Sequence, residues 1–329
     1  AVSAREALGR SLNVPAINVL LMLGQEHGLY PMLRRINLST LAEDDRYGLT
    51  IALGGCETTL IELASLYSAL ANGGVYQSPK LAKDQADNLP IRLFSPGAAY
   101  LVTEILAEIR RPDLPTCWEF TSLPKIAWKT GTSYGYRDAW SIGYNRRYTV
   151  GVWIGNFAGD GRPGLIGAEV AAPLLFDIFN KVDHGKGGWL TKPPTVDTRQ
   201  VCAVSGQKPG RYCENLVTES YLTDRSPDQE GGFHRGYLVE PRSGRRLPPH
   251  YFSIRNAVEK TYIQWPPRIA AWMEANGYPV ERIPPLIPDW QQLQPGQAPI
   301  IRSPSENYVY QLRDHRRISK DLPRSGRSQ

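Results

Sequence analysis

The hydrophobic pattern changes its period once along the chain, and this change constrains the fold more than any other feature. Up to about residue 110, apolar residues recur at the three- and four-residue spacing of amphipathic helices. After residue 124 they alternate with polar residues in three short segments, KIAWKTG, DAWSIGY and RYTVGVWIG, which predicts three strands. A final amphipathic stretch, AEVAAPLLFDIFN, predicts a covering helix. Helices followed by an antiparallel sheet and another helix are typical of an α+β domain.

The starts of the predicted helices carry residues that suit helix N-termini. The N-cap residues are Ser3 with Glu6, Thr59 with Glu62, and Ser95 before Pro96. We expect the helix after Ser95 to reach about Arg110. Pro15 suits the first turn of a helix over VPAINVLLML, and Gly24 is expected to end that helix.

Proline usage divides the chain into parts. Ten of the 27 prolines fall in residues 1–183 and seventeen in the remaining 146 residues, so long regular elements are expected only in the first part. Residues 184–299 are predicted to be irregular, with one short helix at RIAAWMEANG. Residues 300–329 begin with IIRSPSENYVYQL and are predicted to start a small β domain.

Composition excludes several classes of function. The net charge is +6 and the pI about 9.1, but the arginines gather near the end of the chain without a nucleic-acid-binding motif, so we expect no nucleic-acid partner. The five histidines are scattered and show no metal-ligand spacing, so neither a metal nor another cofactor is expected. No apolar run approaches the roughly 20 residues of a membrane helix. We therefore expect any membrane anchor to lie upstream of this chain, whose first residues resemble neither a natural start nor a signal peptide.

The four cysteines are too few for a disulfide scaffold. Cys202 and Cys213 could close a small loop in an oxidising compartment. Cys56 and Cys117 lie in apolar surroundings, which indicates a packing role.

The stretch Lys129-Thr130-Gly131-Thr132 places a charged residue where an apolar alternation meets a polar turn. As a structural feature, Lys129 would be a strand-edge charge that discourages aggregation. As a functional feature, one ammonium and two hydroxyls would hold a carboxylate, while Gly131 would let a ligand approach the backbone closely. The triplet alone favours the structural interpretation, so the surrounding sequence must decide.

Ser11-Leu12-Asn13 supplies that context, at a predicted break between two helices and 118 residues upstream of Lys129. The order and distance of the two motifs resemble those of the penicillin-recognising serine acyltransferases. The segments SAREALGRSLNVPA, ALGGCETTLIELASLYSALANGG, KTGTSYGYRDAWSIGY and GAEVAAPLLFDIFN narrow the resemblance to the transpeptidase domain of class A bifunctional penicillin-binding proteins. VCAVSGQKPGRYC and the late β segment resemble the C-terminal extension of 1C-type members.

The resemblance implies a fold and a set of roles. Residues 1–183 would be the C-terminal part of a β-lactamase/transpeptidase-like domain that lacks its N-terminal part. Ser11 would relay a proton to the leaving amine, Asn13 would hold the substrate amide, and Lys129 would supply positive potential. The hydroxyls of Thr130 and Thr132 would bind the substrate carboxylate beside Gly131, and the Thr132 amide would form half of the oxyanion hole.

The family also implies ligands and a location. Its ligands would be peptidoglycan stem peptides and β-lactam antibiotics, with other cell-wall synthesis proteins as possible partners. The parent protein would carry a glycosyltransferase domain and would act in the periplasm, attached to the inner membrane through a region upstream of this chain.

The nucleophile motif Ser-x-x-Lys is the departure from the family pattern. Two strings have this spelling, Ser122 to Lys125 and Ser205 to Lys208, but Pro124 breaks the first and the second lies in the extension. We therefore expect this chain alone to be inactive. Two rivals stay open: a β-lactamase that uses Glu57 or Glu62 for deacylation, and a non-catalytic binding or scaffold module.

Overall fold

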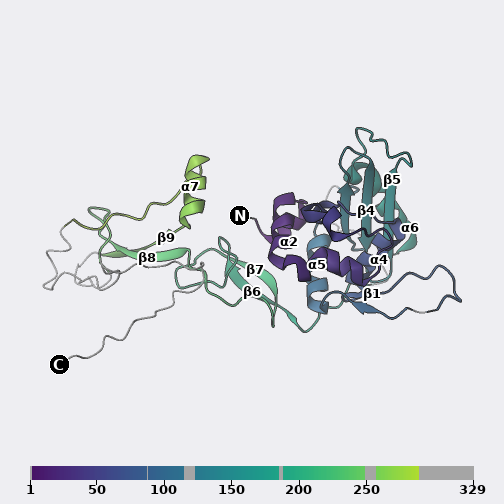
Figure 1. Ribbon diagram of the computed structural model, residues 1–329. Helices are drawn as coiled ribbons and strands as arrows, with labels where there is room; N and C mark the ends of the chain where they lie inside the picture. The colour runs from purple at the N-terminus through teal and green to yellow at the C-terminus, as the bar shows by residue number, and fades with distance from the viewer. Residues whose placement is uncertain (1, 87, 115–122, 185–187, 249–256, 289–329) are drawn as a thin grey trace, which may run out of the picture. The chain divides into compact units, whose positions relative to one another are not determined.

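The computed structural model describes residues 2–86, 88–114, 123–184, 188–248 and 257–288. The chain forms two compact units, Ala1–His234 and Arg235–Gln329. The first unit contains the predicted α+β domain (Figure 1). None of the described helices is both long enough and apolar enough to cross a membrane.

The first unit begins with helices, as the sequence predicts. Their bounds are α1 Ala4–Gly9, α2 Asn13–His27, α3 Leu29–Arg35, α4 Leu60–Ala71 and α5 Pro96–Ala107, with short 3₁₀ turns at Asp44–Arg46 and Gly48–Leu53. Each predicted N-cap accepts a backbone N–H: Ser3 from Glu6, Thr59 from Glu62, and Ser95 from Ala98. Helix α5 ends three residues before the expected Arg110, with the Glu108 N–H bonded to the carbonyls of Glu104 and Ile105.

Gly24 breaks α2 where the sequence predicts an end. Its φ of 68° and ψ of −173° are non-helical, and a short helical piece continues to His27. Glycine adopts a positive φ without the steric cost that a Cβ would add. None of the residues of α2 is buried, and Leu21, Met22 and Leu23 are exposed.

Three strands form the central antiparallel sheet in the order β3-β4-β5, with bounds Ala127–Thr132, Asp138–Tyr144 and Thr149–Gly155. Helices cover both faces, because Leu175 and Phe179 of α6 (Ala172–Val182) lie beside Gly143, while Leu60 and Ala64 of α4 lie beside Gly151. A π-helical turn, Gly167–Ala171, precedes α6. The predicted α+β architecture is thus confirmed.

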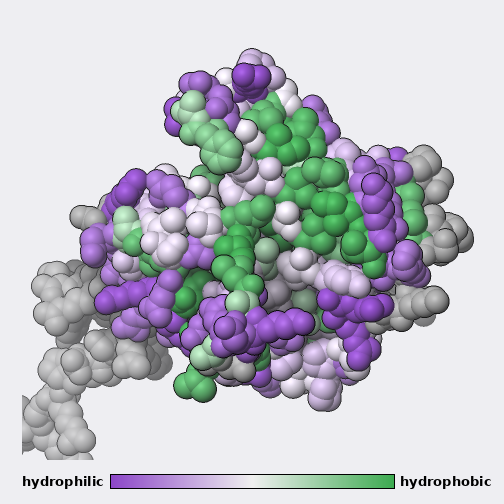
Figure 2. Space-filling model, turned by 90° about the vertical axis from the view of Figure 1, so that its right-hand side faces the viewer, coloured by the Kyte–Doolittle hydropathy of each residue, from purple (hydrophilic) through white to green (hydrophobic). Residues whose placement is uncertain are grey.

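The sheet core forms where the sequence alternates. Ile126 and Trp128 are buried and pack in one cluster with Leu175, Phe176 and Phe179. Figure 2 views the first unit from the side and shows hydrophobic residues gathered in one area of that face. Strand β5 is an edge of the sheet within the described part of the chain.

The chain after residue 183 differs from the prediction of an irregular segment. Its described residues contain four strands: β6 Val196–Cys202, β7 Leu216–Leu222, β8 His234–Val239 and β9 Val258–Ile263. β6 pairs with β7 and β8 with β9. The long, glycine- and proline-containing connections hid these pairs from a pattern search that relies on short turns.

The hairpin β6–β7 belongs to the first compact unit. A Cβ on Gly97 of α5 would lie 2.5 Å from Leu222 and 3.3 Å from Val196, so α5 and the hairpin are in close contact. The compact unit therefore continues past residue 183, whereas the domain limits predicted from the sequence stay a prediction. The predicted helix at RIAAWMEANG is confirmed as α7, Pro267–Ala275. Residues 300–329 lie outside the described residues.

Candidate functional site

Lys129 lies in β3, between a buried and an accessible part of the strand. Trp128 is buried and donates its indole N–H to the Ile109 carbonyl at 3.0 Å, which anchors this part of the strand. The Lys129 ammonium donates to the Thr130 carbonyl at 2.8 Å and to the hydroxyl of Ser11. The two motifs, 118 residues apart in sequence, are therefore in direct contact.

Ser11 is held in an uncommon backbone conformation between α1 and α2. Its φ is 54°, a left-handed value that costs a non-glycine residue about 1–2 kcal/mol. The Ser11 N–H bonds to the Leu8 carbonyl, and the Leu12 N–H bonds to the Ala7 carbonyl. These bonds fix the turn, and strained residues of this kind cluster at functional sites.

Burial lowers the pKa of the Lys129 ammonium below its ordinary value of 10.5. A lysine with a lowered pKa loses its proton more readily than an exposed lysine does. Lys129 can therefore donate a hydrogen bond to Ser11 or, once deprotonated, accept its proton.

Thr130, Gly131 and Thr132 continue β3 toward solvent. Because side chains alternate along a strand, Thr130 and Thr132 lie on the same face of β3. The Thr132 hydroxyl accepts the Gly167 N–H at 3.0 Å, which leaves its own proton free to be donated. Among the described residues, a Cβ on Gly131 would meet only the Trp140 Cβ, at 3.7 Å, so there is space for a ligand on that side of Gly131.

Gly167 is a residue of the site that the sequence did not reveal. A Cβ at this position would lie 2.6 Å from the carbonyl oxygens of both Gly131 and Trp140, so no larger residue fits without moving β3 or β4. The only sequence signal is a glycine at the start of the last amphipathic stretch, and it gives no hint of this contact. This close packing places the Gly167 N–H where it can donate to the Thr132 hydroxyl, and the bond orients that hydroxyl.

Asn13 opens α2, two residues after Ser11. It is exposed, and its side chain makes no hydrogen bond to any of the residues that the structure describes. The predicted role of Asn13 in holding a substrate amide stays a prediction.

The two strings spelled Ser-x-x-Lys are engaged elsewhere. The Lys125 ammonium bonds to Glu104 at 3.4 Å and lies 4.3 Å from the Trp189 ring centre, while Ser122 lies outside the described residues. Ser205 lies in a turn after β6, where its hydroxyl accepts the Gln207 N–H. Neither contact suits a nucleophile with its base.

Glu57 and Glu62, the carboxylates that a β-lactamase would use, are also bound to other residues. Glu62 accepts hydrogen bonds from the backbone and hydroxyl of Thr59 and from the Ser39 N–H. Partial burial alone would raise the pKa of Glu62, but these bonds together outweigh it and lower the pKa. Glu57 pairs with Arg46 at 2.9 Å on the surface. In the part of the chain that the structure describes, neither Glu57 nor Glu62 forms a hydrogen bond or ion pair with Ser11 or Lys129.

Cys202 and Cys213 are free thiols in the structure, and their pairing in an oxidising compartment stays a prediction. Their sulfur atoms lie within 4.8 Å of each other, and one ring nitrogen of His234 lies within the same distance of both. The sequence showed no metal-ligand spacing here because the three residues lie on separate segments.

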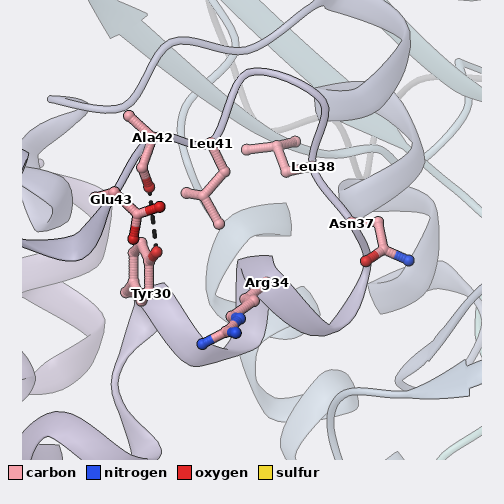
Figure 3. A pocket seen from close by; sticks show the side chains of 7 residues that line it. All are labelled: Tyr30, Arg34, Asn37, Leu38, Leu41, Ala42 and Glu43. Atoms are coloured by element: carbon pink, nitrogen blue, oxygen red, sulfur yellow. Dashed lines mark hydrogen bonds between the residues drawn. The ribbon is translucent and has the colours of Figure 1, made fainter.

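A pocket of about 310 Å³ lies between α3 and the loop that follows it (Figure 3). Tyr30 closes one side by donating to the Ala42 carbonyl at 3.2 Å, while Arg34, Asn37 and Glu43 supply polar groups. None of its lining residues belongs to the two motifs. The pocket is therefore separate from the contact between Ser11 and Lys129.

A Ser-x-Asn serine between two helices, in contact with a strand-borne Lys-Thr-Gly, matches two motifs of the penicillin-binding class of proteins. The family model described as "Penicillin binding protein transpeptidase domain" matches residues 1–171. The chain belongs to this family.

Curated relatives agree with this assignment, and a solved structure agrees with the fold. Penicillin-binding protein 1C of Escherichia coli is 33% identical over 305 residues, which cover 86% of this chain and 38% of the relative. Penicillin-binding protein 1A of Neisseria lactamica is 28% identical over 239 residues. The matched region covers 67% of this chain and 29% of that relative. The crystal structure of penicillin-binding protein 1A from Haemophilus influenzae has a TM-score of 0.55 and 18% identity, over 69% of this chain and 41% of that one. The chain thus spans less than half the length of these relatives.

Proposed function

We propose that this chain supplies the Lys-Thr-Gly side of a D,D-transpeptidase active site that cross-links peptidoglycan stem peptides. The observation that carries the proposal is the contact between the Lys129 ammonium and the Ser11 hydroxyl across 118 residues. The reaction would form an acyl-enzyme on a serine and pass the acyl group to the amine of a second stem peptide.

We assign roles to these residues from the family resemblance, and their positions are compatible with those roles. Thr130 and Thr132 share one face of β3 and would donate hydrogen bonds to the terminal carboxylate of the substrate. Lys129 would supply positive potential beside that carboxylate, and Ser11 would pass a proton to the leaving amine. The Thr132 N–H would form part of the oxyanion hole.

The position of β3 suits a peptide substrate. β3 is an edge of the sheet within the described residues, and an edge strand offers unpaired backbone groups to an extended peptide. A stem peptide would add to this edge, with its carboxylate at the two threonines. A β-lactam would occupy the same position as a mimic of the peptide end.

The nucleophile would be the serine of a Ser-x-x-Lys motif encoded upstream of Ala1. The same upstream region would carry a glycosyltransferase domain and an inner-membrane anchor, and the protein would act in the periplasm. These features are proposed from the family resemblance alone. Other cell-wall synthesis proteins are proposed partners.

The β-lactamase alternative is less well supported, because Glu62 is occupied by helix capping and Glu57 by Arg46. A non-catalytic module would bind a β-lactam carboxylate but would not turn over a peptide. Turnover is therefore the property that separates the proposal from this rival.

The test is release of D-alanine from a stem pentapeptide by the chain extended upstream through Ser-x-x-Lys. Thr130→Val, which removes a carboxylate donor, should lower kcat/KM about tenfold to a hundredfold, the equivalent of roughly 1.5–3 kcal/mol for a hydrogen bond to a charged group. Thr149→Val makes the same change at a partly buried residue of β5, away from the motifs, and should leave kcat/KM within about twofold of the parent enzyme, because Thr149 is not among the proposed substrate-binding residues. Equal effects of the two changes, or an extended chain that folds but releases no D-alanine, would contradict the proposal.

A further inference from the structure

Three side chains of residue types that can bind a metal lie close together in the first unit, at the end of β6 and in the segments that follow it. One ligand atom each of Cys202, Cys213 and His234 lies within 4.8 Å of the other two. The Cys202 sulfur and His234 Nδ1 are 3.6 Å apart. None of the three belongs to the Ser11 and Lys129 motifs.

The observed separation suits coordination to one zinc ion. Zinc binds cysteine sulfur at about 2.3 Å and histidine nitrogen at about 2.0–2.1 Å, so tetrahedral geometry separates the sulfur and nitrogen atoms by about 3.6 Å. A disulfide would require the two sulfur atoms to approach to about 2.0 Å and would give His234 no role. The presence of the imidazole therefore favours a metal over a disulfide.

The turn after Cys202 is shaped around its sulfur atom. The Ser205 N–H points to the Cys202 sulfur at 3.4 Å, and the Gly206 N–H bonds to the Cys202 carbonyl at 2.8 Å. Gly206 has a φ of 69°, which closes the turn. Backbone N–H groups directed at a sulfur orient and stabilise a metal-bound thiolate. Ser205, part of a Ser-x-x-Lys string, is thus a turn residue beside this cluster.

The charge balance also suits a divalent ion. Cys202 is buried, and Cys213 and His234 are partly buried. An uncompensated charge at such a position is costly. Two thiolates, a neutral imidazole and Zn²⁺ sum to zero, and thiolate ligands favour zinc over magnesium or calcium.

We propose that Cys202, Cys213 and His234 bind one zinc ion, with a solvent molecule as the fourth ligand. Binding replaces the two thiol protons, which pass to solvent, and involves no redox change. The ion would join the end of β6, the loop before β7 and the first residue of β8. The ion would stabilise the long connections between these strands, which contain little regular structure.

The experiment uses the 329-residue chain, reduced, stripped with a chelator and titrated with Zn²⁺. We expect one zinc per chain by elemental analysis. Co²⁺ used as a probe should give the visible d–d bands of a tetrahedral site and a thiolate charge-transfer band. Cys202→Ser, Cys213→Ser and His234→Gln should each weaken binding by more than the roughly 10–100-fold typical of a second-shell change. Cys56→Ser is the matched control and should bind zinc like the unaltered chain.

A measurement on the unaltered chain keeps the proposal testable if these variants do not fold. Zn²⁺ should slow alkylation of Cys202 and Cys213 but leave that of Cys56 unchanged, as followed by peptide mass spectrometry. Equal alkylation of Cys202 with and without Zn²⁺ would overturn the proposal. So would a Cys202–Cys213 disulfide that persists in protein isolated from its native compartment.

Discussion

The 329-residue chain is expected to remain unlabelled by a fluorescent penicillin, whereas the chain extended upstream through its Ser-x-x-Lys motif should give a denaturant-resistant labelled band. Acylation requires a serine whose proton is taken by a lysine about one helical turn away. Ser11 cannot replace it, because Val14 stands three residues on. Within the extended chain, Lys129→Met should slow labelling by about a hundredfold or more, since it removes the positive charge beside the reacting groups.

Lys125→Met is the matched control for that change. Lys125 lies on the same segment but pairs with Glu104 instead of Ser11, so its removal should leave the labelling rate near that of the extended chain. A labelled band from the 329-residue chain that disappears on mutating Ser122, Ser205 or Ser11 would contradict the assignment and would locate the nucleophile within this chain.

Phe176→Ala should lower the free energy of unfolding by about 3–5 kcal/mol, the usual cost of truncating a buried phenylalanine. Phe176 is fully buried, and its ring centre lies 5.0 Å from that of Trp128, nearly edge to face at 77°. The Arg111 guanidinium lies 4.2 Å from the same ring centre. The change therefore removes hydrophobic contacts, an aromatic pair and a cation–π contact together.

Chemical denaturation of the 329-residue chain measures this effect. Phe157→Ala makes the same change at a residue that is 98% exposed, and should alter the free energy of unfolding by about 0.5 kcal/mol or less. A similar loss for both variants would show that the cluster around Phe176 is not the main core of the sheet.

The elements that the sequence predicted well are those set by local chemistry. Thr59 and Glu62 form the predicted capping box because both partners lie within one turn. Gly24 breaks its helix because the required φ suits only glycine well. The strands around Lys129 were predicted from the alternation of apolar and polar residues, although helices cover both faces of the sheet that they form.

The features that the sequence did not reveal depend on distant contacts. The close approach of Gly167 to Gly131 and Trp140 brings segments together that no local pattern relates. The strands after residue 183 pair across long connections, so no turn motif marks their register. The cluster of Cys202, Cys213 and His234 escaped detection for the same reason, because its members meet only when these segments fold together.

The contact of Ser11 with Lys129 was only partly predictable from local sequence. Local pattern placed Ser11 at a helix break and Lys129 on a strand, but only the resemblance to a known family related the two. The left-handed φ of Ser11 was not expected, because the sequence has no glycine or asparagine at that position to indicate it.

A crystal structure of the extended chain acylated by a penicillin tests the central assignment most directly. We expect the penicillin carboxylate within hydrogen-bonding distance, about 3.5 Å or less, of the Thr130 and Thr132 hydroxyls, with the Ser11 and Lys129 pair beside the lactam nitrogen. A penicillin bound to a serine with its carboxylate away from both threonines would contradict the assignment of β3 as the substrate-binding strand.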